Sequence, residues 1–574
     1  MYDVIVKGGQ IYDGLGGDPF VGDVGVRDGK IVEVGRLSGP ARETLDADGL
    51  MVTPGFVDIH THYDGQATWA DRISPSSTHG VTTVVTGNCG VGFAPCRPED
   101  RTELVRLMEG VEDIPGAVLT EGLSWDWESF PDYLTAIEQR DHDIDIATQL
   151  PHSALRVYVM GERAIRRETA TAEDRARMAE LAAQAVQAGA LGFTTSRSLL
   201  HKTKAGESVP SLGADEAELT EIALGAKRAG PAVLELATDF AFAGADLPAE
   251  VQLYRRLAQA SGLPVSLAIA FMNERPDLCQ VLVREVDAAN AAGVPIKLQT
   301  VGRSIGVLQG FDFSLHPFAN CPSYKEHAHL PLQARVRVLA NPEVRGRIIA
   351  EAQAPGQPSR ISSRFAELYP LGDPPNYEPR PQDSIAGRAA ASGQSPEAIM
   401  YDILMEGGGH GVLYLPFTNY STGDFSGLAE LMRSKNTLLG LGDGGAHVGV
   451  ICDASQPTFL LSYWGRDRSA ERLPLPFLIQ GLTANNAKAV GLNDRGRIAP
   501  GCKADLNLID FEALRLRAPR AVFDLPAGGR RLTQDAEGYV ATLVSGQATY
   551  RNGEATDALP GRLVRGAKAG PAVS

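Results

Sequence analysis

Apolar and polar residues alternate in short runs at both ends of this chain. Such runs cover residues 2–7, 23–26 and 30–34 near the start and residues 504–509, 539–544 and 548–551 near the end. An alternation of period two is typical of strands that bury one face. We therefore expect residues 1–50 and 485–560 to pair into one small β-sandwich, followed by a loose tail from 561 to 574.

The middle of the chain, residues 51–484, has a different pattern, in which apolar β-branched runs alternate with stretches rich in Ala, Glu and Arg. This pattern predicts βα units around a parallel sheet. The runs expected to be strands are 52–60, 81–87, 144–150, 191–195, 233–238, 264–270, 295–300 and 438–443. Eight such strands predict an α/β fold of the (β/α)8 TIM-like barrel type.

Two connections, 96–140 and 302–434, are longer than a barrel requires. The first contains two tryptophans, Trp125 and Trp127. Long connections that follow barrel strands often contact substrate or cover the site. We therefore predict that both are lids.

Composition narrows the function classes. Of the 574 residues, 43% are hydrophobic and 22% are charged, as in ordinary globular proteins. The net charge of −16 argues against nucleic acids and anionic membranes as partners. With neither a secretory signal pattern nor a run of about 20 apolar residues, we expect a cytoplasmic protein. Six scattered cysteines without CxxC spacing do not describe a disulfide framework.

The strongest chemical motif is an apolar run that ends in His-x-His, at His60 and His62. Alternate residues of a strand share a face, so both imidazoles can point at one ion above the barrel mouth. The preceding residues, Pro54-Gly55-Phe56-Val57-Asp58, favour a metal site over a chance surface pair.

This first-strand motif resembles that of the amidohydrolase superfamily. The segment 80–90, which reads GVTTVVTGNCG, is similar to the N-acyl-D-amino-acid deacylase (D-aminoacylase) branch, as are residues 151–161 and 189–193. The resemblance implies that Cys89 is a metal ligand, and a thiolate suits zinc. It also implies hydrolysis of a non-peptide C–N amide bond in an N-acyl-(D-)amino acid or a related small amide.

A second apolar run ends at Asp443, between Gly442 and Gly444. A carboxylate at the end of the last barrel strand can contact a metal, accept a proton from water and return it to the leaving nitrogen. We predict that Asp443 is both a ligand and the general acid/base. Together with His60, His62 and Cys89 it is expected to hold about one zinc ion per chain.

The chain departs from the resemblance at the fifth and sixth strands, where D-aminoacylases have metal-binding histidines. Residues 231–240 and 264–273 contain no histidine. A second ion is therefore doubtful. Glu235 or Asp239 could supply a replacement ligand, or each could be a buried hydrogen-bonding group or a loop charge.

Several further side chains are weaker candidates. His152, at the end of the third strand, could polarise the scissile carbonyl or form a structural hydrogen bond. Arg197 and Arg303 follow strand ends and could bind a substrate carboxylate, although ion pairs are an alternative role. His410 and His447 carry still weaker signals.

Two other functions stay open at this stage. One is the opening of a cyclic amide or imide, as in hydantoinases. The other is a non-catalytic barrel that binds a small molecule. The sequence leaves a homo-oligomer open as well, and in each case the expected partner is a small molecule.

Overall fold

The centre of the molecule is a ring of parallel strands. The computed structural model describes residues 1–238, 246–275, 277–354, 359, 361–568 and 570. One arc of the ring is β6 (Phe56–Asp58), β8 (Val81–Thr86) and β9 (Asp145–Thr148). A longer arc is β10 (Leu150–Pro151), β11 (Gly192–Ser196), β12 (Val233–Ala237), β13 (Val265–Ala268), β14 (Ile296–Gln299) and β18 (Thr437–Leu438).

The ring closes where the last strand meets the first. There β19 (Leu441–Gly444) pairs in parallel with β7 (His60–Thr61). Each of the eight expected strands therefore has a counterpart. The described strands are assigned to three parallel sheets that follow one another in the order expected of a TIM-like barrel, with a smaller domain beside them.

Helices follow the strands and cover the outside of the ring. They include α5 (His152–Met160), α7 (Ala172–Ala188), α8 (Glu216–Ala229), α9 (Leu247–Ser261), α10 (Asp277–Ala291) and α16 (Ser426–Arg433). The start of α7 shows why these helices form locally. The Thr171 side chain accepts from the backbone N–H of Asp174, whose carboxylate accepts from Thr171 in return, a reciprocal cap. None of the described helices is both long enough and apolar enough to cross a bilayer.

The two ends of the chain share a sheet, as expected. Its strands are β1 (Tyr2–Ile11), β2 (Phe20–Arg27), β3 (Lys30–Gly35), β4 (Ala41–Asp46), β5 (Met51–Pro54), β20 (Leu506–Ile509), β25 (Tyr539–Val544), β26 (Gln547–Arg551) and β27 (Glu554–Ala555). The halves meet where β5 pairs antiparallel with β20. The structure has one continuous nine-stranded sheet, curled so that Ile31 hydrogen-bonds with Gly501 and Cys502.

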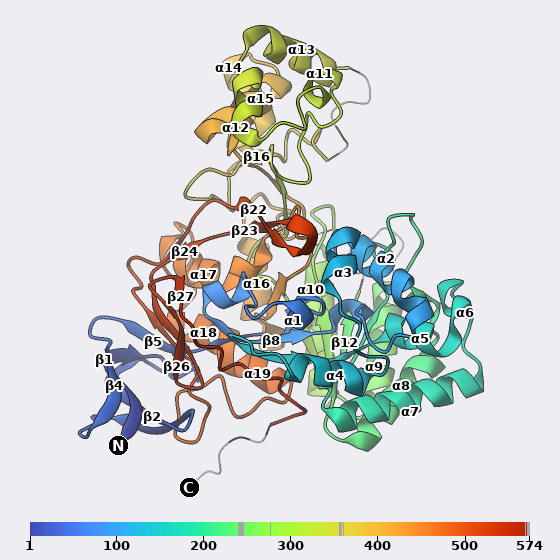
Figure 1. Ribbon diagram of the computed structural model, residues 1–574, viewed down its shortest axis with the longest axis vertical. Helices are drawn as coiled ribbons and strands as arrows, with labels where there is room; N and C mark the ends of the chain where they lie inside the picture. The colour runs from blue at the N-terminus through green and yellow to red at the C-terminus, as the bar shows by residue number, and fades with distance from the viewer. Residues whose placement is uncertain (239–245, 276, 355–358, 360, 569, 571–574) are drawn as a thin grey trace.

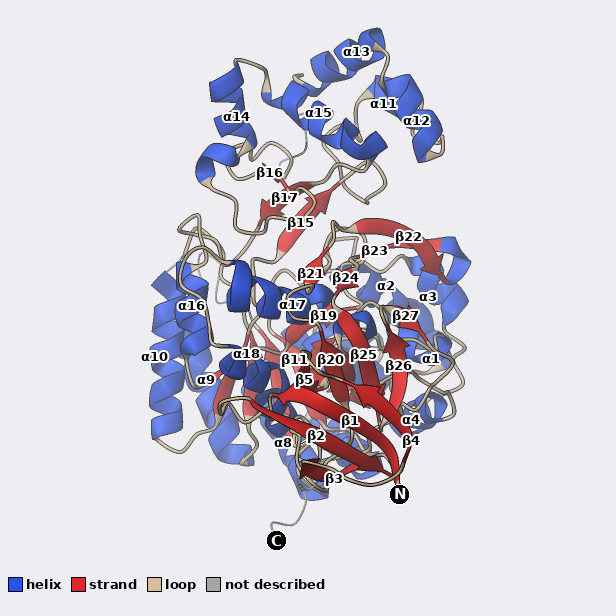
Figure 2. Cartoon of the chain, turned by 90° about the vertical axis from the view of Figure 1, so that its left-hand side faces the viewer, coloured by secondary structure: helices blue, strands red, loops and turns tan. Residues whose placement is uncertain are grey.

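One part of the C-terminal segment leaves this sheet, contrary to expectation. Strands β22 (Arg520–Leu525) and β23 (Gly529–Thr533) pair only with each other among the described strands. They lie between α3 (Gly116–Gly122) and the top of the molecule (Figure 2). We call residues 520–533 the C-terminal hairpin.

The connection 302–434 is a folded helical lobe, seen at the top of Figure 1. Its helices are α11 (Pro322–Lys325), α12 (Leu332–Leu339), α13 (Pro342–Ala352), α14 (Ile385–Ser392) and α15 (Pro396–Gly409). They enclose an apolar core of their own, which includes Leu339, Ile348 and Met400. Three short strands, β15 (Gly306–Gln309), β16 (Tyr369–Pro370) and β17 (Leu413–Pro416), join the lobe to the barrel.

The other long connection, 96–140, folds into α2 (Arg101–Val111), α3 and α4 (Phe130–Glu138). Trp127 is buried, and its indole N–H donates to the Phe93 carbonyl at 2.8 Å. This tryptophan therefore packs inside the protein, while the helices around it approach the barrel mouth.

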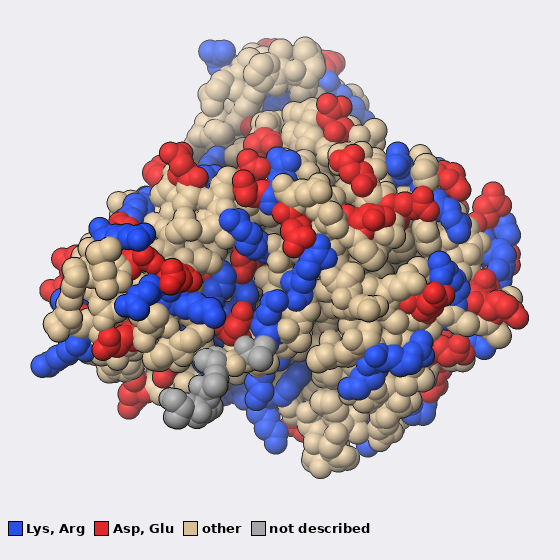
Figure 3. Space-filling view, turned by 60° about the horizontal axis from the view of Figure 1, so that its bottom comes forward, with Lys and Arg blue, Asp and Glu red and all other residues tan. Residues whose placement is uncertain are grey.

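Residues 561–568 pack against the rest of the molecule. Residues Gly561, Leu563 and Lys568 form β-bridges with His142, Ile146 and Leu492. Lys and Arg side chains gather near this end of the chain in Figure 3, mixed with acidic ones. A cavity of about 1230 Å³, lined by charges of both signs, lies between this segment, the sheet and the barrel.

Candidate metal centre

His60 and His62 lie where the first and last barrel strands meet. The backbone N–H of His62 donates to the Gly444 carbonyl at 2.7 Å. The buried Asp58 carboxylate accepts from the N–H groups of His60 (3.2 Å) and Gly442 (3.1 Å). The aspartate of the first-strand motif thus joins the two strand ends, and the imidazole centroids lie 5.4 Å apart.

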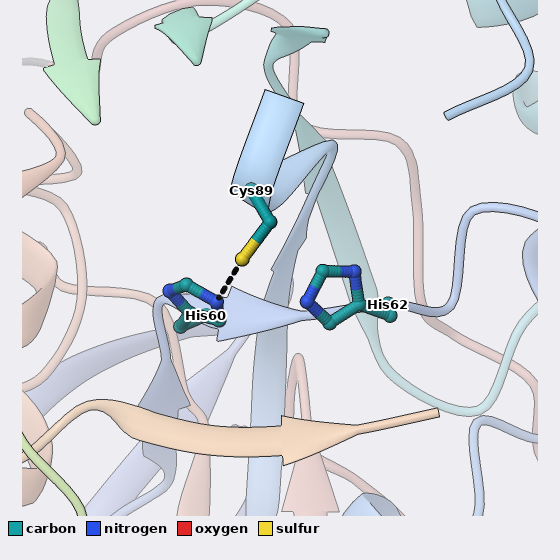
Figure 4. A group of neighbouring side chains, drawn as sticks. All are labelled: His60, His62 and Cys89. Atoms are coloured by element: carbon teal, nitrogen blue, oxygen red, sulfur yellow. Dashed lines mark hydrogen bonds between the residues drawn. The ribbon is translucent and has the colours of Figure 1, made fainter. Parts of the chain in front are cut away.

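Cys89 reaches His60 from the end of β8. Its backbone is in the left-handed region, with φ of 54°, and its sulfur lies 3.3 Å from His60 Nε2 (Figure 4). On the other side of the ring, His60 Nδ1 is 2.8 Å from Gln299 Oε1, whose amide nitrogen donates to Ser266 Oγ. Because the Gln299 oxygen can only accept, the proton resides on Nδ1 and the Nε2 lone pair faces the sulfur.

His62 lies between two carboxylates. Its Nε2 is 3.4 Å from Asp443 Oδ1, and its Nδ1 is 3.4 Å from Glu112 Oε1. Glu112 follows α2 in the 96–140 connection, and its backbone carbonyl accepts from the N–H of His447. Sequence reasoning missed Glu112, since it sits between Val111 and Asp113 without any motif around it.

The unpaired atoms of this cluster fit a metal ion. Both ring nitrogens of His62, Oε1 of Glu112 and Oε1 of Glu235 are buried and form no hydrogen bond in the described part of the chain. Buried polar atoms without partners are costly, so they mark a place for an ion or another ligand. Nitrogen, sulfur and carboxylate oxygen together are donors that suit zinc.

Two overlapping groups of ligand atoms meet these conditions. One is His60, His62 and Cys89, and the other is His62, Glu112 and Asp443, with the atoms of each group within 4.8 Å of one another. The structure therefore brings together all four residues predicted to bind the metal and adds Glu112 to them.

Glu235 lies behind His60 and Cys89. Its Oε2 accepts from the Cys89 backbone N–H at 3.2 Å, and its Oε1 is 3.7 Å from His60 Nδ1. Burial raises the pKa of Glu235 to about 8. Asp239, the other carboxylate considered as a replacement ligand, lies outside the described residues.

Burial and charge act in opposite directions at Asp443. Burial favours the protonated form, but His62, whose Nε2 lies 3.4 Å from Asp443 Oδ1, holds the pKa of Asp443 well below its ordinary value. The carboxylate is therefore ionised, and about 13% of the side chain is exposed. Asp443 can both bind a cation and accept a proton.

Three predicted site residues have other partners. His152 is fully buried, with Nδ1 2.8 Å from Thr195 Oγ1 and Nε2 2.8 Å from Glu218 Oε1. Arg197 forms a two-pronged pair with Glu250, with both contacts at 2.7 Å. His152 therefore has no ring nitrogen left for a carbonyl, and the Arg197 fork is already occupied.

Arg303 is buried as well. Its guanidinium contacts Asp453 at 3.1 Å and the Ser455 hydroxyl at 3.0 Å, and it stacks 4.0 Å from the centre of the Tyr377 ring. These contacts give Arg303 a structural role as a buried cation, instead of the role of binding a substrate carboxylate.

The remaining histidines differ in their surroundings. His447 Nε2 is 3.9 Å from Glu112 Oε2 and 4.0 Å from Asp443 Oδ2, so it borders the cluster. His410 is exposed at the end of α15 in the helical lobe. His201, which sequence reasoning did not select, hydrogen-bonds with Ser196 Oγ at 2.8 Å. Burial, with the nearby His447 and His62, lowers the pKa of His201 to about 3.

Solved structures with the same fold include D-aminoacylase. One D-aminoacylase structure has a TM-score of 0.66 at 23% identity, covering 98% of this chain and 100% of that one. The structure of N-acyl-D-glutamate deacylase from Bordetella bronchiseptica, complexed with zinc and a phosphonate inhibitor, has a TM-score of 0.62 at 22% identity and covers 98% and 99%.

Sequence comparison agrees. D-aminoacylase of Alcaligenes xylosoxydans xylosoxydans is 37% identical over 195 residues, which is 34% of this chain. The match spans only 37% of that relative's length. The model of the amidohydrolase family matches residues 43–550, nearly the whole chain. This protein therefore belongs to the amidohydrolase family.

Proposed function

We propose that this protein is a zinc-dependent hydrolase of non-peptide C–N bonds that deacylates an N-acyl-(D-)amino acid or a related small amide. The observation that carries the proposal is the cluster of His60, His62, Cys89 and Asp443 at the ends of the barrel strands, of which the first three are buried. Active sites of TIM-like barrels lie at this end of the strands.

Each residue of the cluster has a distinct part in this proposal. His60, His62, Cys89 and Asp443 would hold one ion, which supplies a Lewis acid that polarises a carbonyl and makes water more acidic. Gln299 keeps the proton of His60 on Nδ1. Glu112 faces Nδ1 of His62 at 3.4 Å, without a hydrogen bond, and in this proposal its charge orients that ring.

Asp443 performs the proton transfer. Its ionised carboxylate accepts a proton from the attacking water and gives it to the nitrogen of the leaving amine. The left-handed backbone at Asp443, with φ of 52°, turns the side chain toward His62 at the end of β19.

Named relatives support this substrate class. Besides D-aminoacylase, N-acyl-D-aspartate deacylase of Alcaligenes xylosoxydans xylosoxydans is 34% identical over 194 residues, again about a third of each chain. One D-aminoacylase structure is described in terms of a binuclear centre with one-metal activation and second-metal attenuation. For the present chain we propose one ion, because the histidines of the fifth and sixth strands are absent.

The test is a substrate screen combined with metal analysis. Purified protein is loaded with zinc, its zinc content is measured, and N-acyl-D-amino acids, N-acyl-L-amino acids and cyclic amides are offered in parallel. We expect about one zinc per chain and hydrolysis of linear N-acyl compounds. Hydrolysis of cyclic amides alone would favour a hydantoinase-like reaction, and no hydrolysis of any amide would contradict the proposal.

A further inference from the structure

A small cavity lies beside the metal-binding cluster. Its volume is about 30 Å³, and both His62 and Asp443 line it. Most of its other walls are apolar and include Trp69, Ile114, Val118, Val448, Leu525 and Leu532. A space of this size holds one or two water molecules, or a group of a few carbon atoms.

Two of these wall residues come from the C-terminal hairpin. Leu525 and Leu532 are 8% and 3% exposed, whereas Phe523 on the same strand is 64% exposed. The pairing register shifts between Val522 and Leu525, which lets Leu525 turn inward while Phe523 stays in solvent. A segment that belongs in sequence to the small domain thus closes one side of the barrel site.

The hairpin is held in place by hydrogen bonds to three other parts of the molecule. Arg530 donates to the Asp312 carbonyl (2.8 Å) and the Ser314 hydroxyl (2.9 Å), where the helical lobe begins. Arg531 donates to the Ser74 carbonyl (2.6 Å) and hydroxyl (2.9 Å). The backbone N–H of Leu532 donates to the Val448 carbonyl at 2.6 Å, just beyond Asp443. The wall is therefore anchored next to the reacting groups.

The charged residues around the cavity are already paired. Arg531 contacts both carboxylate oxygens of Asp524, at 2.8 and 2.7 Å. Asp453 accepts from Arg303 at 3.1 Å. Among the described residues that line the cavity, Arg531 is the one lysine or arginine, and its pairing with Asp524 leaves no such side chain to receive a carboxylate. A negative group there would be buried beside the Asp443 carboxylate without a lysine or arginine to pair with it, which is unfavourable.

We infer that the C-terminal hairpin forms a wall of the substrate pocket and restricts the group next to the scissile bond to a short, neutral, apolar one. This inference rests on the proposed function and specifies which substituents of the substrate the pocket accepts. The group is either the acyl chain or the amino-acid side chain, and both are varied in the test.

The experiment compares substrates of different size in hairpin variants. Zinc-loaded protein is assayed with N-acetyl, N-butyryl and N-hexanoyl derivatives of one amino acid, and with N-acetyl derivatives of alanine and leucine. In the Leu525→Ala and Leu532→Ala variants, we expect the ratio of kcat/KM for the substrate with the longer group to kcat/KM for the substrate with the shorter group to rise at least about tenfold. Phe523→Ala is the matched control, and its ratios should equal those of the unchanged protein.

Charge selectivity is tested with a substrate pair of equal size. N-acetylglutamine should be hydrolysed at least about tenfold faster than N-acetylglutamate, with N-succinamoyl and N-succinyl groups as the acyl counterpart. Preference for the carboxylate, or size ratios unchanged in both leucine variants, would overturn the inference while leaving amide hydrolysis intact. Leu532→Val, a smaller change, should shift the ratio in the same direction if an alanine variant does not fold. The absence of any hydrolysis would refute the proposed function instead.

Discussion

Glu112 offers the sharpest test of the metal centre, since the structure alone identifies it. In Glu112→Gln the side chain keeps its size but loses the charge that faces His62 Nδ1 at 3.4 Å. At an effective dielectric constant of about 20, full unit charges on both groups at this separation would interact by about 5 kcal/mol. A zinc-bound imidazole is neutral and carries only part of the charge of the ion, so this figure is an upper limit for the loss. The cost of burying the carboxylate offsets part of that energy.

Residues that orient metal ligands typically change metal affinity or activity 10–100-fold, which corresponds to about 1.4–2.7 kcal/mol. We therefore expect zinc affinity in Glu112→Gln to fall by about that factor. The assay is competition with a chelator of known affinity, with thermal unfolding measured alongside. Glu121→Gln is the control, because it removes the same charge from an exposed position of the neighbouring α3. If both variants bound zinc as tightly as the unchanged protein, the role of Glu112 would be refuted.

Three further predictions address the proton transfer, the ligands and the stability. Asp443→Asn should lower kcat by at least about a hundredfold with the fold intact, and normal turnover with normal zinc content would mean another proton carrier. The Cys89→Ala variant should lose zinc, because it lacks the thiolate ligand. The control is Cys279→Ala, which should keep its zinc because Cys279 lies away from the cluster. Equal zinc contents in the two variants on elemental analysis would exclude Cys89 as a ligand. Asp145→Asn should destabilise the protein by up to about 3 kcal/mol at neutral pH, because it removes one buried carboxylate from Arg495 (2.6 Å) and Lys503 (3.1 Å), which keep Asp494 and Asp505 as partners. Burial alone would raise the pKa of Asp145, but Lys503 and Arg495 lower it below its ordinary value. The contribution of the Asp145 carboxylate to stability is therefore present above about pH 4 and is lost on acidification. Denaturation curves at several pH values should show a shallower acid decline in the variant.

The sequence by itself determined the strands, the pairing of the chain ends and four members of the cluster. These features follow from local chemistry. Period-two burial predicts strands, and His-x-His on a strand places two imidazoles on one face. Strand ends of a closed barrel converge, so Asp443 could be assigned to the same mouth as His60 and His62 although it is far from them in sequence. The ligand role of Cys89 came from the resemblance to D-aminoacylases.

Only the tertiary structure decided which polar groups are free and which are engaged. Arg197, Arg303 and His152 carry the chemistry of a binding site, but Glu250, Asp453 and Glu218 already occupy them. The sequence shows that a residue is charged but not which residue it pairs with. Hydrogen bonds between segments far apart in sequence produce no periodic pattern from which they could be predicted.

Glu112 and the C-terminal hairpin reached the site for the same reason. Each is placed by packing between elements whose separation in sequence is large, such as the contact of Leu532 with Val448. Their positions depend on how the connections fold over the barrel, which local propensity does not encode. The residue pattern therefore indicated the type of chemistry. The position of the Glu112 carboxylate and the shape of the pocket could be determined only from the folded structure.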